Sequence, residues 1–462
     1  MAISDESILT SAAGAALRRA FRGKLITVAD EAYEQARKVW NGQIDKSPAL
    51  IASCADVDDA AEALRFATEE GLVVAVRGGG HSFAGFSTCD GGVVIDLSPM
   101  RAVTVDTDAK TARAEGGATW AIFDAATHAH GLASTGGLMS TTGIAGLTLG
   151  GGIGWLNRKF GLACDNLLGV EMLTASGELV RASAGENPEL FWALRGGGGN
   201  FGIVTSFEYR LHPVNTVVGG LMLFREEQTP DVLRFYRDYV TQCADEFTTM
   251  LSAITGPSVD FVPADMQGRP SMAFAGCHCG DPADAERALQ PLRDLGPAVD
   301  LFEPIPYPDM QRMFDEDLPY GIRCYQKAGY LPDLSDGAIE VISKHTRPLS
   351  SPNSTFDLHH MGGAIGRVAD DATAFGDRRS PFCFNIVGLW NEAAQDPVHK
   401  TYVRDFAAAL EPFGSGGVYV NFTADPDRVR AAYDDAKYAR LRAVKRQYDP
   451  ENLFRLNQNI QP

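Results

Sequence analysis

Three glycine-rich segments constrain the fold of this chain more than any other feature. They read RGGGHSFAGFS from Arg77 to Ser87, TTGIAGLTLGGGIG from Thr141 to Gly154, and LRGGGGNFG from Leu194 to Gly202. In a helix interior each glycine costs about 1 kcal/mol relative to alanine, so segments this rich in glycine do not form helices throughout. We predict that they are stretches of backbone pressed close to a ligand or to one another.

The first segment predicts an anion site at the end of a strand. It directly follows the apolar run from Leu72 to Val76. Residues without a Cβ atom can turn several N–H groups toward one anion, such as a pyrophosphate, and Arg77 and Ser82 add polar side chains. His81 then lies beside the ligand, where a neutral imidazole is a base or a nucleophile. The alternative is an incidental histidine of a surface loop.

Two familiar nucleotide-binding motifs do not fit this segment. A Rossmann fingerprint needs a glycine where Phe83 stands and a helix afterwards, whereas the following CDGGVVID predicts a turn and a strand. A P-loop needs a lysine after its last glycine, and Phe86 follows Gly85. The segment is therefore a different kind of phosphate loop.

The pattern along the chain predicts two kinds of domain. Around the first loop, ALIASC, DVDDAAEALRFATEEG and LVVAV are typical of a strand, a helix and a strand. After Pro213 the glycine clusters stop, and longer strands and amphipathic helices follow, such as TTMLSAITG, PSMAFAG and PDVLRFYRDYVTQC. We predict one domain over residues 1–213, a second over 214–418, and a return to the first domain over 419–462.

Composition and charge argue against several classes of protein. The 462 residues can bury more than one core without a disulfide framework, and the formal net charge of −18 without a basic stripe argues against nucleic acid. No apolar run approaches a membrane span, and acids precede arginines at the N-terminus, unlike in a signal peptide, so we predict a cytoplasmic protein.

Cys277, His278 and Cys279 lack the second ligand pair of a zinc site, so we predict no metal. The oligomeric state stays open, with a homodimer as one option.

Five motifs in order suggest a family. They are R-G-G-G-H-S, S-T-T-G-I-A-G-L-T-L-G-G-G-I-G-W-L, G-L-A-C-D-N, G-N-F-G-I-V-T and the terminal Y-D-P-E-N-L-F-R-L-N-Q-N-I. Together they span nearly the whole chain, which resembles the berberine-bridge-enzyme-like branch of the vanillyl-alcohol-oxidase flavoproteins, most of all its bacterial members. The resemblance implies an α+β fold: a PCMH-type FAD-binding domain of two α/β subdomains, and a substrate domain with an antiparallel sheet backed by helices.

The resemblance also implies how FAD is held. The histidine of the glycine loop, here His81, would be bonded covalently to the 8α carbon of FAD. Many members have a second, cysteinyl link, but Met139 stands at that position, so a single link is expected. Thr142 would lie over the flavin and, being about as large as the valine of oxygen-using relatives, favours an oxidase. The full set of expected FAD-binding residues is Arg77, Gly78, Gly79, Gly80, His81, Ser82, Gly85, Thr142, Gly143, Gly146, Gly151, Gly152, Gly154, Asn166, Ile203, Val204, Asn457 and Asn459.

The catalytic residues are less clearly implied. Relatives often place a tyrosine base after an asparagine in a strand returning from the substrate domain, but here the strand is expected to read Tyr419-Val420-Asn421-Phe422. Phenylalanine cannot accept a proton, which favours an amine or an activated hydroxyl compound over a plain alcohol. Trp390 is expected to be a pocket wall. Asn421 is a further candidate, and the others, each with a structural alternative, are Tyr325, Lys327, His359, His360 and Arg378.

The sequence therefore predicts an FAD-linked oxidase that takes hydride from a small-molecule substrate and passes electrons to O₂, giving H₂O₂. One alternative is a carbohydrate or alcohol oxidase, or a dehydrogenase, of the same family. Another is a flavin-binding protein without turnover. A third is a noncovalent nucleotide-binding protein in which His81 is incidental.

Overall fold

The computed structural model describes residues 8–423 and 425–462. The acidic start of the chain, which contributed to the prediction of a cytoplasmic protein, therefore lies largely outside the described residues. Within them, no helix is both long and apolar enough to cross a membrane, and no group of three or more His, Cys, Asp or Glu side chains could hold a metal ion.

The first subdomain is built on a small mixed sheet in the order β1-β2-β4-β3. Its parallel strands are β2 (Leu50–Ser53), β4 (Val93–Asp96) and β3 (Val74–Arg77), and β1 (Lys24–Ile26) is antiparallel to β2. Helix α3 (Val57–Glu69) begins where the Asp56 side chain accepts a hydrogen bond from Asp59 N, and its apolar face packs on the sheet. Helix α1 (Ala12–Ala20) packs against α3, and Tyr33 of helix α2 (Tyr33–Ala36) packs on the other face of the sheet with Ile51, Ala75 and Val94. The predicted strand, helix and strand are confirmed, and the first glycine loop follows β3.

The second subdomain is an antiparallel sheet in the order β5-β6-β10-β8-β9. Residues of helices α4 and α7 share its apolar core, together with residues of the C-terminal α14. The element bounds are β5 (Val103–Asp106), β6 (Thr111–Glu115), α4 (Trp120–His128), β7 (Leu132–Ala133), α5 (Ile144–Leu149), α6 (Asn157–Phe160), η1 (Ala163–Asn166), β8 (Leu167–Leu173), β9 (Leu179–Ser183), α7 (Pro188–Leu194), β10 (Ile203–Arg210) and β11 (His212–Pro213).

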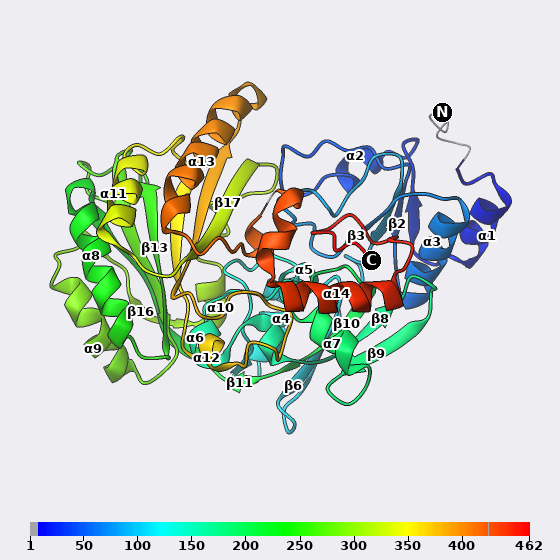
Figure 1. The fold of residues 1–462 in the computed structure, drawn as a ribbon, viewed down its shortest axis with the longest axis horizontal. Helices are drawn as coiled ribbons and strands as arrows, with labels where there is room; N and C mark the ends of the chain where they lie inside the picture. The colour runs from blue at the N-terminus through cyan, green and yellow to red at the C-terminus, as the bar shows by residue number, and fades with distance from the viewer. Residues whose placement is uncertain (1–7, 424) are drawn as a thin grey trace.

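The third unit is a large antiparallel sheet with helices on one face. Its main order is β15-β12-β14-β13-β18-β19-β17, and β16 pairs with β12. Helices α8, α9, α11 and α13 bury their apolar faces on its outer side, as Figure 1 shows at the left. The element bounds are β12 (Thr216–Arg225), η2 (Glu226–Gln228), α8 (Thr229–Tyr239), η3 (Val240–Gln242), β13 (Phe247–Thr255), β14 (Pro270–His278), α9 (Pro282–Arg293), β15 (Val299–Asp300), β16 (Glu303–Pro306), α10 (Tyr307–Gln311), β17 (Arg323–Leu331), α11 (Asp336–His345), β18 (Thr355–His360), α12 (Ala364–Arg367), β19 (Phe382–Trp390), η4 (Ala393–Gln395), α13 (Asp396–Leu410) and η5 (Glu411–Phe413).

The end of the chain returns to the first two subdomains. Residues 419–422 were predicted to form a strand, and this is wrong, because they form the 3₁₀ turn η6 (Val420–Phe422). After η7 (Pro426–Ala432), helix α14 (Asp435–Tyr448) packs against α7, and Figure 1 shows it in red on the side of the molecule that holds the first two subdomains. The predicted α+β class, with an antiparallel sheet backed by helices, is confirmed.

Candidate active site

A cavity of about 1210 Å³ lies between the inner face of the large sheet and the glycine-rich loops. A drug-sized ligand needs about 300–1,000 Å³, so this volume has room for a dinucleotide beside a small substrate. All three glycine segments reach its wall, through Gly78 to Gly80, through Thr142, Gly143 and Gly146, and through Gly198, Gly199 and Gly202. Segments far apart in sequence are thus brought to one ligand site, as their composition predicts.

The first two loops touch backbone to backbone. A Cβ atom added at Gly79 would lie 2.5 Å from Gly143 N, and one added at Gly143 would lie 2.5 Å from Gly79 N. Gly80, with φ of 68°, adopts a conformation that side chains disfavour. Neither contact leaves room for a side chain, so glycine is required for both loops to approach the cavity.

His81 lies in the cavity wall with an unused nitrogen. Its ring stacks on Trp40 with centroids 4.6 Å apart and lies edge-on to Phe83. Among the described residues, His81 Nε2 is buried without a hydrogen-bond partner. Burial lowers the pKa of His81 to about 4, so the imidazole is neutral at pH 7. A neutral imidazole held by aromatic neighbours is a competent nucleophile toward a group in the cavity.

The C-terminal return completes the wall. Asn421 lines the cavity, and its Nδ2 donates to Leu147 O and to Tyr419 Oη, each at 2.9 Å. Asn457 also lines it, with Nδ2 donating to Gly199 O at 3.2 Å, while its Oδ1 has no partner within residues 8–423 and 425–462. Asn459 Oδ1 is similarly unpaired there, although Asn459 lies outside the wall.

Comparison with known proteins gives the family. A family model described as "FAD binding domain" matches residues 48–183, and one described as "Berberine and berberine like" matches residues 418–461. (R)-6-Hydroxynicotine oxidase of Paenarthrobacter nicotinovorans is 32% identical over 474 residues, which cover 96% of this chain and 97% of that protein. The chain belongs to the berberine-bridge-enzyme-like family of FAD-linked oxidoreductases.

Two solved structures confirm the fold of this FAD-linked oxidoreductase. The crystal structure of 6-hydroxy-D-nicotine oxidase from Arthrobacter nicotinovorans is 29% identical, with a TM-score of 0.86 over 96% of this chain and 98% of that one. The berberine-bridge-enzyme-like protein 1 of Physcomitrella patens is 23% identical, with a TM-score of 0.87 over 98% and 99% of the two chains, and shows the fold alone.

The cavity of the oxidoreductase fits FAD by its own features. The loops around Gly79 and Gly143 form a cradle that any Cβ would fill, and His81 offers an unpaired nitrogen there. Ser82, Thr142, Gly146 and Val204 also line the cavity. These residues, with Asn421 and Asn457, are the ones that would hold FAD.

The prediction that Arg77 strengthens the anion site is wrong. Its Nη2 lies 2.9 Å from Asp96 Oδ2, both side chains are buried, and its Nη1 donates to Ala36 O at 2.7 Å. The guanidinium is therefore neutralised within the first subdomain. Arg77 is a strand residue whose side chain passes beside Gly80, within 3.6 Å of where a Cβ of that residue would lie, and ends on Asp96.

Several other residues expected to bind FAD lie behind the cavity wall. Asn166 is engaged structurally, since its Nδ2 donates to Phe160 O and Leu162 O and its Oδ1 lies 2.7 Å from His212 Nε2. The side chain of Ile203 is fully buried in the core of the first subdomain, and its expected contact with FAD through the backbone stays a prediction. The remaining glycines shape the backbone behind the wall and are Gly85, Gly151, Gly152 and Gly154.

Tyr419 supports the glycine loop of the oxidoreductase and was missed in the sequence. Its Oη accepts hydrogen bonds from Gly152 N at 2.9 Å and from Ile153 N at 3.2 Å, and its ring lines the cavity. The residue was overlooked because residues 419–422 were interpreted as a strand. An aromatic hydroxyl two residues before Asn421 is the signal that could have found it.

Four predicted catalytic residues are wrong because they lie on the helix-covered side of the large sheet. Tyr325 Oη donates to Asp425 Oδ1 at 3.1 Å, and Lys327 forms an ion pair with the same carboxylate. Trp390, expected in the pocket wall, is 1% exposed and donates to Asp396 Oδ1 at 2.8 Å. His360 Nε2 accepts from Arg158 Nη1 at 2.8 Å. None of the four reaches the cavity.

Other polar residues of the same three strands face the cavity, at positions that alternate with the four residues on the helix-covered side. They are Gln326 on β17, Asn385 on β19, and Asp357 and His359 on β18. Burial lowers the pKa of His359 to about 4, and burial raises the pKa of Asp357 to about 6. Of the sequence candidates from this sheet, His359 is the one that lines the cavity, and its contact with a substrate stays a prediction.

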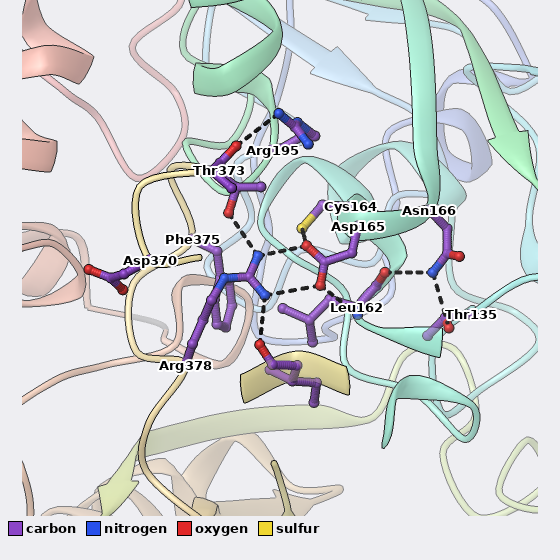
Figure 2. Close-up of polar contacts among 12 residues, drawn as sticks. Thr135, Leu162, Cys164, Asp165, Asn166, Arg195, Asp370, Thr373, Phe375 and Arg378 are labelled. Atoms are coloured by element: carbon purple, nitrogen blue, oxygen red, sulfur yellow. Dashed lines mark hydrogen bonds and ion pairs between the residues drawn. The ribbon is translucent and has the colours of Figure 1, made fainter. Parts of the chain in front are cut away.

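Arg378, a catalytic candidate from the sequence, forms a buried ion pair and does not line the cavity. Figure 2 shows its guanidinium between Asp165 and Thr373, with Nη2 2.6 Å from Asp165 Oδ1 and 2.8 Å from Thr373 Oγ1. Nη1 also donates to Ile365 O at 3.2 Å, and the side chains of Arg378 and Asp165 are only 2% and 6% exposed. This buried pair fastens the segment after α12 to the turn η1 of the FAD-binding part, outside the cavity wall.

Proposed function

We propose that this enzyme is an oxidase that carries FAD on His81 alone and oxidises a small, largely apolar amine or activated hydroxyl compound with O₂ as the electron acceptor. The observation that supports it most is the neutral, unpaired and cavity-facing imidazole of His81 in the glycine loop. FAD, when bound, supplies the hydride acceptor. A cytoplasmic location stays a prediction from the sequence.

The rest of the wall supports a single covalent link. Met139, 8% exposed, lines the cavity where a second tether would have to start, and a thioether cannot form that bond. Cys164 and Cys89 are buried outside the wall, where burial raises the pKa of both thiols. Among the described residues that line the cavity there is no cysteine.

The substrate side favours a compound that needs no strong base. Phe422 lines the cavity beside His359, with ring centroids 5.4 Å apart, and it cannot accept a proton. His359 is neutral at pH 7, with a pKa of about 4, and is a weak base. An amine with a free lone pair can lose hydride without transferring a hydroxyl proton. The relative named for 6-hydroxynicotine, a hydroxylated amine, agrees with this substrate class.

The test of the covalent link is an intact-mass spectrum of the denatured protein. We expect the parent to carry the mass of one FAD and the His81→Ala variant to carry none. His130→Ala, which removes an exposed histidine, is the matched control and should keep the FAD mass. An apo mass for a flavin-replete parent, with a colourless acid-precipitated pellet, would contradict the proposal.

The test of oxidase behaviour is stopped-flow reoxidation of the reduced enzyme by O₂. We expect reoxidation well above the rate of free flavin because Thr142, of valine size, lines the cavity. Reoxidation no faster than free flavin would indicate a dehydrogenase. The alternative function is the oxidation of sugars. Glucooligosaccharide oxidase from Sarocladium strictum, which is 27% identical to this chain, supports it. This alternative predicts that the enzyme turns over oligosaccharides and not amines.

A further inference from the structure

We propose that Gln326 and Asn385 form an amide pair that recognises a flat ring with a hydrogen-bond donor and an acceptor side by side, as in a lactam or a 2-hydroxypyridine. The pair lies on the cavity-facing side of the large sheet, on the neighbouring strands β17 and β19. This inference rests on the proposed function, because it places the substrate in the same cavity as FAD.

The two amides bind each other and leave one donor and one acceptor over. Asn385 Nδ2 donates to Gln326 Oε1 at 3.3 Å. Gln326 Nε2 and Asn385 Oδ1 have no partner in the described part of the chain, although the residues are only 0% and 5% exposed. Buried amides are normally paired in full, so two unpaired atoms on adjoining residues of a cavity wall indicate a ligand that completes them.

One free donor and one free acceptor remain whichever way the two amides are turned. Exchanging the nitrogen and oxygen of both residues would reverse the bond between Gln326 and Asn385. The reversed bond would again use one donor and one acceptor, and the other nitrogen and oxygen would stay free. In both arrangements the pair presents a donor next to an acceptor, and its complement is a group with an acceptor next to a donor.

The surroundings favour a flat ring over a sugar. Asp357 of β18 lies opposite Asn385 of β19 in the strand register. Ser252 Oγ donates a hydrogen bond to Asp357 Oδ1 at 2.7 Å. These polar groups therefore form a row across neighbouring strands. Strands lie about 4.8 Å apart, so the part of this row from Asp357 to Gln326 spans roughly 10 Å, the length of one substituted ring. Apolar side chains line the cavity beside this row, among them Met250, Val387, Leu389 and Phe422, together with the polar Thr355 and His359 of β18. A sugar would need polar partners on most of its edges.

The test compares ligands by titration calorimetry on the purified full-length holoenzyme. The probes are 2-hydroxypyridine, which has the lactam edge, N-methyl-2-pyridone, which lacks the donor, and D-glucose. We expect 2-hydroxypyridine to bind at least tenfold tighter than N-methyl-2-pyridone. Equal affinities would overturn the inference, and this comparison needs no variant.

Variants assign the preference to the amide pair. The double variant Gln326→Leu/Asn385→Leu removes both amides together. In this variant the affinity for 2-hydroxypyridine should exceed that for N-methyl-2-pyridone by less than threefold. Lys327→Arg changes the next residue of β17 on the opposite face and should keep the preference of the parent. A preference that survives the double change, or glucose binding that depends on the pair while 2-hydroxypyridine binding does not, would overturn the inference.

The same preparations separate this inference from the proposed function. Covalent FAD with equal affinities for the two pyridones would overturn the amide-pair site alone. Loss of the FAD mass or of aerobic reoxidation, with the tenfold preference intact, would overturn the proposed function alone. Calorimetry reads binding directly and does not depend on the colour or the attachment of the flavin.

Discussion

Asp124 is a carboxylic acid placed where water does not reach it. It lies on α4, is 1% exposed, and accepts a hydrogen bond from Gln311 Nε2 at 3.1 Å. Its other oxygen has no partner within the described residues. Burial raises the pKa of Asp124 from 3.8 to about 7, against a smaller opposite effect of the bond from Gln311. The folded protein therefore holds a proton that the unfolded chain releases at lower pH.

Replacement of Asp124 by asparagine tests this titration. Between about pH 4 and pH 7 the folded state binds more protons than the unfolded state, so the parent loses stability as the pH rises through that window. At about 1.36 kcal/mol per pKa unit, the loss is at most about 4 kcal/mol. We expect the free energy of unfolding of Asp124→Asn, minus that of the parent, to increase from pH 4 to pH 7 and then level. Urea denaturation at each pH measures it.

The control for this prediction is Asp108→Asn, which changes an exposed carboxylate. Its difference from the parent should be small at every pH. A difference for Asp124→Asn that stays constant between pH 4 and pH 7 would show that the Asp124 carboxyl is already charged in that window.

At the scale of elements, local rules predicted loops well and strand faces poorly. The glycine segments were identified correctly as backbone that comes close to other atoms, because that follows from the residue type alone, although α5 (Ile144–Leu149) forms a short helix within the second segment. Alternation along β17 shows that Tyr325 and Lys327 share one face and Gln326 lies on the other, but both faces of this sheet are covered. Which face meets the cavity depends on the packing of helices distant in sequence. The sequence therefore could not select Gln326 and Asn385 over Tyr325 and Lys327.

The buried pair of Arg378 and Asp165 is expected to stabilise the connection between η1 and the segment after α12. Removing one partner leaves the other charge buried and unpaired, which costs about 3–5 kcal/mol, whereas replacing both by apolar residues costs less. We expect Arg378→Met to lower the free energy of unfolding by that amount and Arg378→Met/Asp165→Leu to lower it less. Urea denaturation of the holoenzyme measures both.

A surface pair provides the comparison for Arg378. Arg440 Nη2 lies 2.7 Å from Glu189 Oε1, and both side chains are exposed. Arg440→Met should therefore change stability by less than about 1 kcal/mol. If Arg378→Met were as stable as Arg440→Met, the Arg378 pair would contribute little to the fold.

At the scale of the molecule, Arg158 is one of the side chains that join the two halves around the cavity. Arg158, on α6 of the FAD-binding part, has a side chain that is 4% exposed. Its Nε donates to Phe247 O at 3.0 Å, and its Nη2 donates to Cys243 O at 2.9 Å. Its Nη1 donates to Met361 O and to His360 Nε2. Because the cavity wall comes from both halves, this side chain helps to hold the FAD loops opposite the sheet.

Loss of Arg158 is expected to weaken the connection between the two halves. Arg158→Met leaves several buried carbonyl groups without a donor, at about 1–3 kcal/mol each where water does not replace it. We expect scanning calorimetry of the holoenzyme to show a lower midpoint and the two halves unfolding in separate steps. The control is Arg181→Met, since among the described residues the Arg181 side chain forms an ion pair only with Glu208, at 3.1 Å on the surface, and its loss should leave the midpoint nearly unchanged. A single cooperative transition at the midpoint of the parent would mean that the sheet and the FAD loops are held together by other contacts across the cavity.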